Sequence, residues 1–280
     1  MWALAVGVLL TTGDRYVAAA VVLGAFVVPL ALATRLADSQ RLPGVDWQLM
    51  GRLFAFGGLL GFLASALLER PLTSQPPLVF DSWVGVVEET SKLVLLAVMT
   101  RRLAVKTTRS GLVLGGVIGF GFAAFESAGY ALAASIDGGD SHAVIAMVLT
   151  RAAATPFTHG LWTAIAGAGL FASSRNGRFR PTLLAVVALA GVAAVHAGWD
   201  LMPNLAADLQ TQLAGASSGH AMGADLSANL LDAAGQALLS VPPLYAAYRL
   251  RPRPKGGAGS ARVPASEAVA AVGRLDRSAA

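Results

Sequence analysis

The feature that most constrains this chain is a series of apolar runs, most of them long enough to cross a lipid bilayer as a helix. A helix needs about 20 apolar residues to span the hydrocarbon layer. Seven runs approach or exceed that length: Tyr16–Thr34, Leu49–Leu68, Trp83–Thr100, Gly111–Ala134, Thr155–Ser173, Thr182–Asp200 and Leu226–Tyr248. An eighth, Trp2–Thr12, is shorter and is either a truncated first helix or the core of a signal peptide. The pattern predicts an all-α, polytopic bundle of seven or eight transmembrane helices.

Composition agrees with a membrane protein. Only 13% of the 280 residues are charged and 55% are hydrophobic, whereas soluble proteins carry about 25% charged residues. This balance excludes a disordered chain and argues strongly against a soluble globular enzyme. Because the sequence contains no cysteine, it can form neither a disulfide nor a cysteine nucleophile, iron–sulfur or thiolate zinc site.

The basic residues predict the orientation of the bundle. Most of the 21 Lys and Arg residues fall in four stretches, near 35–41, 101–109, 175–180 and 249–277. By the positive-inside rule these stretches lie in the cytoplasm, together with the C-terminus. Residues 1–250 then form one membrane domain, and 251–280 form a disordered basic cytoplasmic tail. Since topology accounts for the net charge of +5, we expect the lipid bilayer and no nucleic acid as a partner.

The segment before the fifth full span has its own signals. Thr155-Pro156 is a typical helix start, with Thr as the N-cap and Pro at the first helical position. We expect the preceding stretch, His142–Ala154, to lie along the outer membrane interface, where Arg151 can extend its charge toward water.

Ionisable residues inside membrane spans are costly and therefore indicate function. The Trp83–Thr100 run contains Glu88, Glu89 and Lys92. Glu88 and Lys92 lie four residues apart on one helix face and can neutralise each other. Glu89 points about 100° away and has no predicted partner in its own helix. A buried ion pair that fixes helix packing explains Glu88 and Lys92, but it does not explain Glu89.

Three further spans carry polar groups at a similar depth. The Gly111–Ala134 span has Glu126 and, one turn later, Tyr130. The next two spans carry His159 and His196, and the latter is followed one turn later by Asp200, which can orient its imidazole. Counting about 1.5 Å per residue from the cytoplasmic ends places these groups within roughly one helical turn of each other, nearer the outer face.

Such a set of side chains supports two related hydrolytic chemistries. Glu126, His159 and His196 are candidate ligands for Zn²⁺ or another divalent metal that activates water. Alternatively, a buried glutamate acts as general base while the histidines stabilise the oxyanion. The same groups also suit an ion- or proton-coupled transporter, although the sequence shows no inverted repeat, or a catalytically inactive scaffold.

Three runs together resemble the PrsW family of bacterial intramembrane proteases. The family pattern Glu-Glu-x-x-Lys, Phe-Glu-x-x-x-Tyr and His-x-x-x-Asp is matched, in order and each within a span, by the runs Glu88–Lys92, Phe125–Tyr130 and His196–Asp200. The resemblance covers a core of residues 83–200. It implies a multi-pass protease of the bacterial plasma membrane that cleaves a single-pass membrane protein, such as an anti-sigma factor, near the outer face. PrsW proteins are grouped with metalloproteases, whereas related CAAX-processing enzymes resemble glutamate-dependent hydrolases.

The combined hypothesis assigns a role to each residue. Glu88 or Glu89 activates the attacking water, and Glu89 is preferred because Lys92 can occupy Glu88. His159 and His196 hold the metal, or the water and oxyanion. Four further residues have supporting roles: Glu126 as a further ligand or base, Asp200 to orient His196, Lys92 as the local cation, and Tyr130 as a hydroxyl donor.

Overall fold

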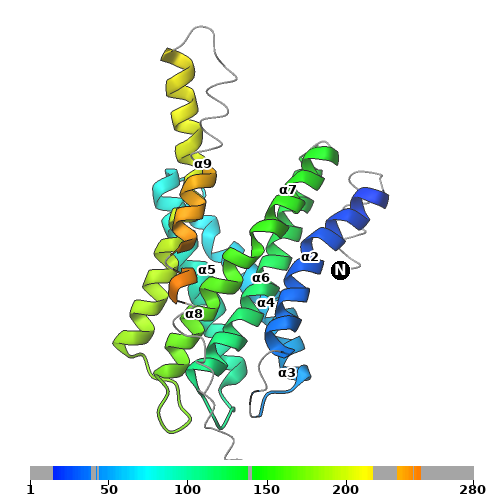
Figure 1. Cartoon of the computed structure of the whole chain (residues 1–280). Helices are drawn as coiled ribbons and strands as arrows, with labels where there is room; N and C mark the ends of the chain where they lie inside the picture. The colour runs from blue at the N-terminus through cyan, green and yellow to red at the C-terminus, as the bar shows by residue number, and fades with distance from the viewer. Residues whose placement is uncertain are drawn as a thin grey trace, which may run out of the picture. The chain divides into compact units, whose positions relative to one another are not determined.

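The computed structural model describes residues 15–38, 42, 44–137, 141–216, 232–241 and 243–246. The predicted short run Trp2–Thr12 and the predicted tail, 251–280, lie outside the described residues. Within them the regular elements are helices, which confirms the all-α prediction: α2 (Arg15–Asp38), α3 (Trp47–Arg52), α4 (Gly58–Glu69), α5 (Pro77–Thr100), α6 (Thr108–Ile136), α7 (Ser141–Ala154), α8 (His159–Ala172) and α9 (Leu183–Ala216) (Figure 1). Residues 232–241 and 243–246, inside the predicted last span, are helical as well.

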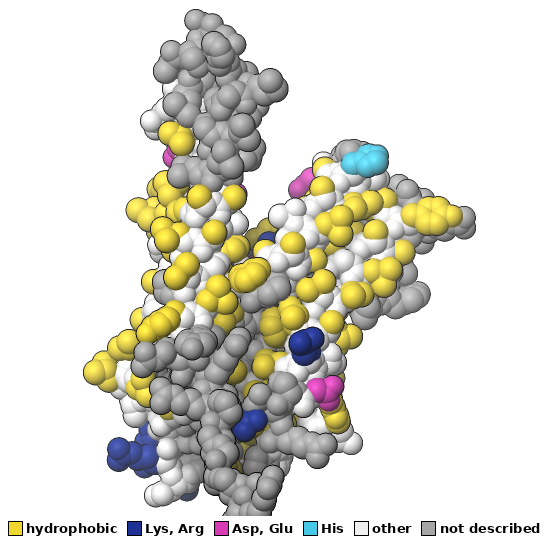
Figure 2. Space-filling view, in the orientation of Figure 1, with side chains coloured by type: hydrophobic (Ala, Val, Ile, Leu, Met, Phe, Trp, Pro, Cys, Tyr) yellow, Lys and Arg dark blue, Asp and Glu magenta, His cyan; other side chains and the backbone are white. Residues whose placement is uncertain are grey.

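Among the residues that the structure describes, four helical segments are long and apolar enough to cross a membrane: Tyr16–Asp38, Trp47–Leu72, Thr108–Ile136 and Leu183–Gln212. Each contains most or all of a predicted span. Large apolar side chains are exposed along them, including Leu23 and Val27 of α2. Figure 2 shows apolar side chains spread over the visible helices and several Lys and Arg side chains toward the lower end of the view. This distribution suits a surface that faces lipid.

Helix α5 differs from these four segments because it carries more charged residues within one apolar run. Its 24 residues correspond to about 36 Å of helix, enough to cross the hydrocarbon layer. However, Asp81, Glu88, Glu89 and Lys92 are all buried on it. Helix α5 packs against α4, α8 and α9, so these groups face other helices and are kept away from lipid.

Two predicted helix ends were wrong. Helix α9 does not end near Asp200 but continues through Pro203 to Ala216, and Asn204 on this extension donates a hydrogen bond to Asp81 Oδ2 of α5 at 3.0 Å. Thr155 does not begin the fifth span, because a 3₁₀ turn, Thr155–Phe157, follows α7 directly. Thr158 then breaks the helix with φ −108° and ψ −131°, and α8 starts at His159.

Helix α6 is the central helix of the bundle. It is almost entirely buried, it packs most extensively against α8, and it also contacts α2, α4 and α7 (Figure 1). Three α6 glycines, one per turn, each face a backbone carbonyl of antiparallel α8, where an added Cβ would collide: Gly111 faces Gly167, Gly115 faces Thr163, and Gly119 faces His159. Small residues permit such close backbone contact between membrane helices, and the contact fixes the start of α8 against α6.

This packing predicts that Gly115→Ala destabilises the protein by roughly 1–3 kcal/mol, because the new methyl group must push away the backbone of α8. Gly191→Ala on α9 is the matched control, since no atom lies within 4 Å of its added Cβ. Thermal unfolding of the purified variants in one detergent measures the difference. Equal midpoints for the two variants would contradict this view of the α6–α8 contact.

Candidate active site

The first part of the site is a group of charges on α5. The ammonium of Lys92 lies 2.6 Å from Glu89 Oε1 and 3.3 Å from Glu88 Oε2. Lys92 and Glu89 are 0% exposed and Glu88 is 4% exposed. The expectation that Glu89 has no partner in its helix was therefore wrong. A lysine stem reaches residues both three and four positions away on a helix, and here Glu89 is the nearer partner.

Lys92 also joins α5 to its neighbours. Its Nζ lies 4.0 Å from the centre of the Phe122 ring of α6 and 2.9 Å from His159 Nδ1 of α8. Because an ammonium group can only donate hydrogen bonds, Nδ1 of His159 accepts this one. Two carboxylates, one imidazole and one aromatic face thus surround a single buried cation.

The imidazole of His196, on α9, lies between carboxylates. Its Nδ1 is 3.1 Å from Glu89 Oε1, and its Nε2 is 3.2 Å from Asp200 Oδ2 and 3.7 Å from Glu88 Oε2. Glu89 is held further by a hydrogen bond from the Thr163 hydroxyl at 3.2 Å. Asp200 therefore approaches the nitrogen that faces Glu88, and Glu89 holds the opposite nitrogen. The sequence predicted that Asp200 contacts and orients His196. The structure shows the contact, but Glu89 is the residue that holds the nitrogen opposite Glu88.

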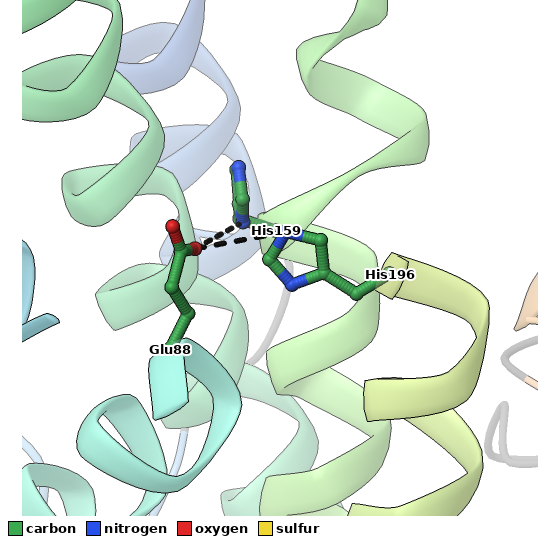
Figure 3. Close-up of side chains that lie close together, drawn as sticks. All are labelled: Glu88, His159 and His196. Atoms are coloured by element: carbon green, nitrogen blue, oxygen red, sulfur yellow. Dashed lines mark ion pairs between the residues drawn. The ribbon is translucent and has the colours of Figure 1, made fainter. Parts of the chain in front are cut away.

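His159, the first residue of α8, has a similar environment. Its Nε2 donates to Glu126 Oε2 of α6 at 2.9 Å, and its Nδ1 lies 3.7 Å from Glu88 Oε2. The two imidazoles are packed together, with ring centres 4.9 Å apart. Each histidine thus has one nitrogen on a carboxylate from another helix and the other nitrogen facing Glu88 (Figure 3).

The arrangement fits a divalent metal. Glu88, His159 and His196 each offer a ligand atom within 4.8 Å of the others, and all three are buried. Two histidines and one glutamate form a known catalytic zinc ligand set. A neutral imidazole donates from one nitrogen only, so the carboxylates on both sides of His196 require either a second proton or a metal ion. The ligand set expected from the sequence contained Glu126. In the structure Glu126 instead contacts Nε2 of His159, the nitrogen that does not face Glu88.

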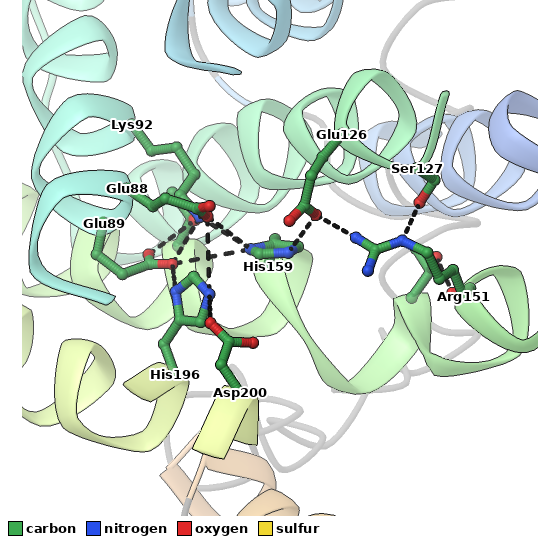
Figure 4. Close-up of polar contacts among 11 residues, drawn as sticks. Glu88, Glu89, Lys92, Glu126, Ser127, Arg151, His159, His196 and Asp200 are labelled. Carbon is green, nitrogen blue, oxygen red and sulfur yellow. Dashed lines mark hydrogen bonds and ion pairs between the residues drawn. The ribbon is translucent and has the colours of Figure 1, made fainter. Parts of the chain in front are cut away.

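Arg151 of α7, expected at the outer membrane interface, instead contacts α6. Its Nη2 forms an ion pair with Glu126 Oε2, its Nε donates to Ser127 Oγ at 3.1 Å, and its guanidinium lies 4.4 Å from the Tyr130 ring centre. It therefore points toward Glu126 and Ser127 of α6 (Figure 4). The structure shows no hydrogen bond between the described Tyr130 hydroxyl and Glu126. One sequence feature could have predicted this pair: Glu126 lies inside a span that contains no cation of its own.

A cavity of about 540 Å³ borders this group of side chains. Glu126, His159 and Asp200 lie on its wall. Aromatic and charged residues from several helices complete the lining, among them Phe80, Asp81, Arg151, Trp162 and Trp199. Its volume lies in the range of small-molecule binding pockets, so there is room for part of a substrate beside His159 and Asp200.

Comparison with known proteins agrees with this geometry. Residues 45–222 match the sequence profile of the PrsW family intramembrane metalloproteases. No curated protein and no solved structure matches the chain. The matched region covers more than half of the chain and includes every residue of the site described above. The chain therefore belongs to the PrsW family of intramembrane metalloproteases, and it is a membrane hydrolase.

Proposed function

We propose that this protease cleaves a single-pass membrane protein, such as an anti-sigma factor, near the outer face of the bacterial plasma membrane. Supporting this, the site lies within the helical bundle and borders a cavity lined by α5, α6, α7, α8 and α9 residues. Glu88 lies twelve residues before the end of α5 at Thr100, or about 18 Å from the cytoplasmic end by helical rise. Family membership favours proteolysis over the transporter and inactive-scaffold alternatives.

The proposed topology is multi-pass, with seven or eight spans and a cytoplasmic C-terminus. The basic loops after α5 and α8, which include Arg101, Arg102, Arg175 and Arg178, support a cytoplasmic location for these ends of the helices. In this orientation, Glu88 and Glu126 lie in the outer halves of α5 and α6. A substrate with a secreted domain would therefore approach the site from the outer face.

The observation that carries the mechanism is the position of Glu88 Oε2, which lies 3.7 Å from a nitrogen of each histidine. Glu88, His159 and His196 would hold Zn²⁺ or another divalent ion, which would supply a Lewis acid and lower the pKa of a coordinated water. The Nδ1 lone pair of His159 would then bind the metal in place of the Lys92 ammonium, which would keep Glu89 as its partner. In the glutamate-dependent alternative, Glu88 itself accepts the proton of the attacking water. Glu88 replaces Glu89 as the preferred residue because Lys92, His196 and Thr163 already bind Glu89.

The remaining residues hold or move protons. Glu89 accepts from His196 Nδ1 and Glu126 accepts from His159 Nε2, which directs the other nitrogens toward Glu88. Lys92 offsets part of the negative charge of Glu88 and Glu89. Asp200, whose side chain is 32% exposed, borders the cavity beside His196. It is the carboxylate best placed to pass a proton to the amine that leaves when the peptide bond breaks.

Removal of either histidine is expected to abolish cleavage. His159→Asn and His196→Asn should each lower the rate of cleavage of a membrane-anchored reporter substrate by roughly 100-fold or more, since each removes a nitrogen that faces Glu88. His142→Asn, an exposed histidine on α7, is the matched control and should cleave normally. Near-normal cleavage by either of the first two variants, at wild-type protein levels, would refute the proposed site.

Removal of metal distinguishes the metal-dependent mechanism from the glutamate-dependent one. We expect 1,10-phenanthroline to inactivate the purified protease and added Zn²⁺ to restore it, because the ligand set contains two neutral nitrogen donors and one carboxylate. The measurement is the initial rate of substrate cleavage in detergent before chelation, after chelation and after readdition. Activity that persists after exhaustive chelation, in protein with no metal detected by mass spectrometry, would contradict the metal and support Glu88 as the general base.

A further inference from the structure

Arg151 contacts three side chains of α6 that lie within about one helical turn. It binds Glu126 and Ser127 through its guanidinium, and it stacks on Tyr130. Among the described residues, the Glu126 carboxylate is bound by Arg151 and His159 alone. Both contacts reach the same oxygen, Oε2 (Figure 4). The orientation of Glu126 therefore depends on Arg151.

Hydrogen-bond chemistry then determines the state of His159. Arginine donates and never accepts, so Glu126 Oε2 is the acceptor for Arg151 and is set to accept from His159 Nε2 as well. Nδ1 of His159 lies 2.9 Å from the ammonium of Lys92, which can only donate, so Nδ1 must be an acceptor. The two ends of the imidazole thus require the same tautomer, with its proton on Nε2 and its lone pair on Nδ1.

Chain connectivity makes Arg151 well suited to this task. Arg151 and His159 stand at opposite ends of the helix break between α7 and α8, which contains the 3₁₀ turn Thr155–Phe157. The hydroxyl of Thr155, the first residue of this turn, donates to the Arg151 carbonyl of α7 at 3.0 Å. Glu126 is thus held from both ends of one short segment, and it ties the irregular stretch to α6.

We propose that Arg151 is a positioning residue of the active site: it fixes Glu126 as the acceptor for His159 Nε2–H, so that Nδ1 of His159 faces Glu88. This role rests on the proposed function, and it extends the site beyond the Glu-Glu-x-x-Lys, Phe-Glu-x-x-x-Tyr and His-x-x-x-Asp motifs to α7. Arg151 acts through Glu126 and need not touch the peptide bond that is cleaved.

Kinetics of purified full-length variants test the proposal. Arg151→Gln should lower kcat roughly 10- to 100-fold, the usual effect of losing a residue that orients a ligand, with KM within about twofold of wild type. Arg151→Lys keeps the charge but lacks the planar fork, so it should regain part of the lost kcat. Arg102→Gln, at an exposed loop position, is the matched control and should leave both constants unchanged.

A double-mutant cycle isolates the path through Glu126. If Arg151 acts by orienting that carboxylate, Arg151→Gln has little further effect on kcat in a Glu126→Gln background. Additive losses of kcat, or a rise in KM with kcat unchanged, would overturn the proposal and indicate direct contact of Arg151 with the substrate. Thermal unfolding of the same variants identifies any loss that comes from misfolding.

A spectroscopic readout keeps this test independent of protease activity. In ¹⁵N-histidine-labelled protein, the His159 signals, assigned by their loss in His159→Asn, should report a proton on Nε2 that is hydrogen-bonded to Glu126. Arg151→Lys and Arg151→Gln should progressively shift the Nε2 signal as this hydrogen bond weakens, while Lys92 keeps Nδ1 an acceptor. Unchanged His159 signals in folded Arg151→Gln would overturn the proposal. A wild-type protein that cleaves no membrane substrate would refute the proposed function, while the ¹⁵N signals would still decide the role of Arg151.

Discussion

The structure depends on keeping several charges together where lipid surrounds the bundle. Isolated charges at membrane depth cost several kcal/mol each, and a buried ion pair repays this cost only when its hydrogen bonds are satisfied. Lys92 satisfies the condition through Glu88, Glu89 and His159. Since these partners come from α5 and α8, the charges can be buried only when the helices assemble. The polar group therefore specifies the packing as well as the chemistry.

The helix packing in turn places the histidines. Glycines of α6 let its backbone touch α8, which brings His159, the first residue of α8, beside Glu126 and Glu88. His196 comes from the middle of α9 and stacks on Trp162 of α8, with ring centres 4.6 Å apart. Four helices thus contribute to one site, and the partly exposed Asp200 lies on the wall of the adjoining cavity.

Much of this arrangement follows from the sequence because membrane helices are long and their apolar runs are distinct. The helical class, most helix ranges and the co-location of Glu88, Glu126, His159 and His196 follow from run length and depth. Other features depend on tertiary contacts that spacing does not encode. The neighbouring helices determine which of the two carboxylates Lys92 approaches more closely. Arg151 forms an ion pair with Glu126, which lies 25 residues earlier in the chain.

The central claim is that Glu88, His159 and His196 form one metal-binding centre inside the bundle. X-ray absorption at the zinc edge of the purified, zinc-loaded protein tests it most directly. We predict scattering from two imidazoles in the wild-type protein and from one in the folded His196→Asn variant. A zinc environment without imidazole, or one that His196→Asn leaves unchanged, would contradict the claim.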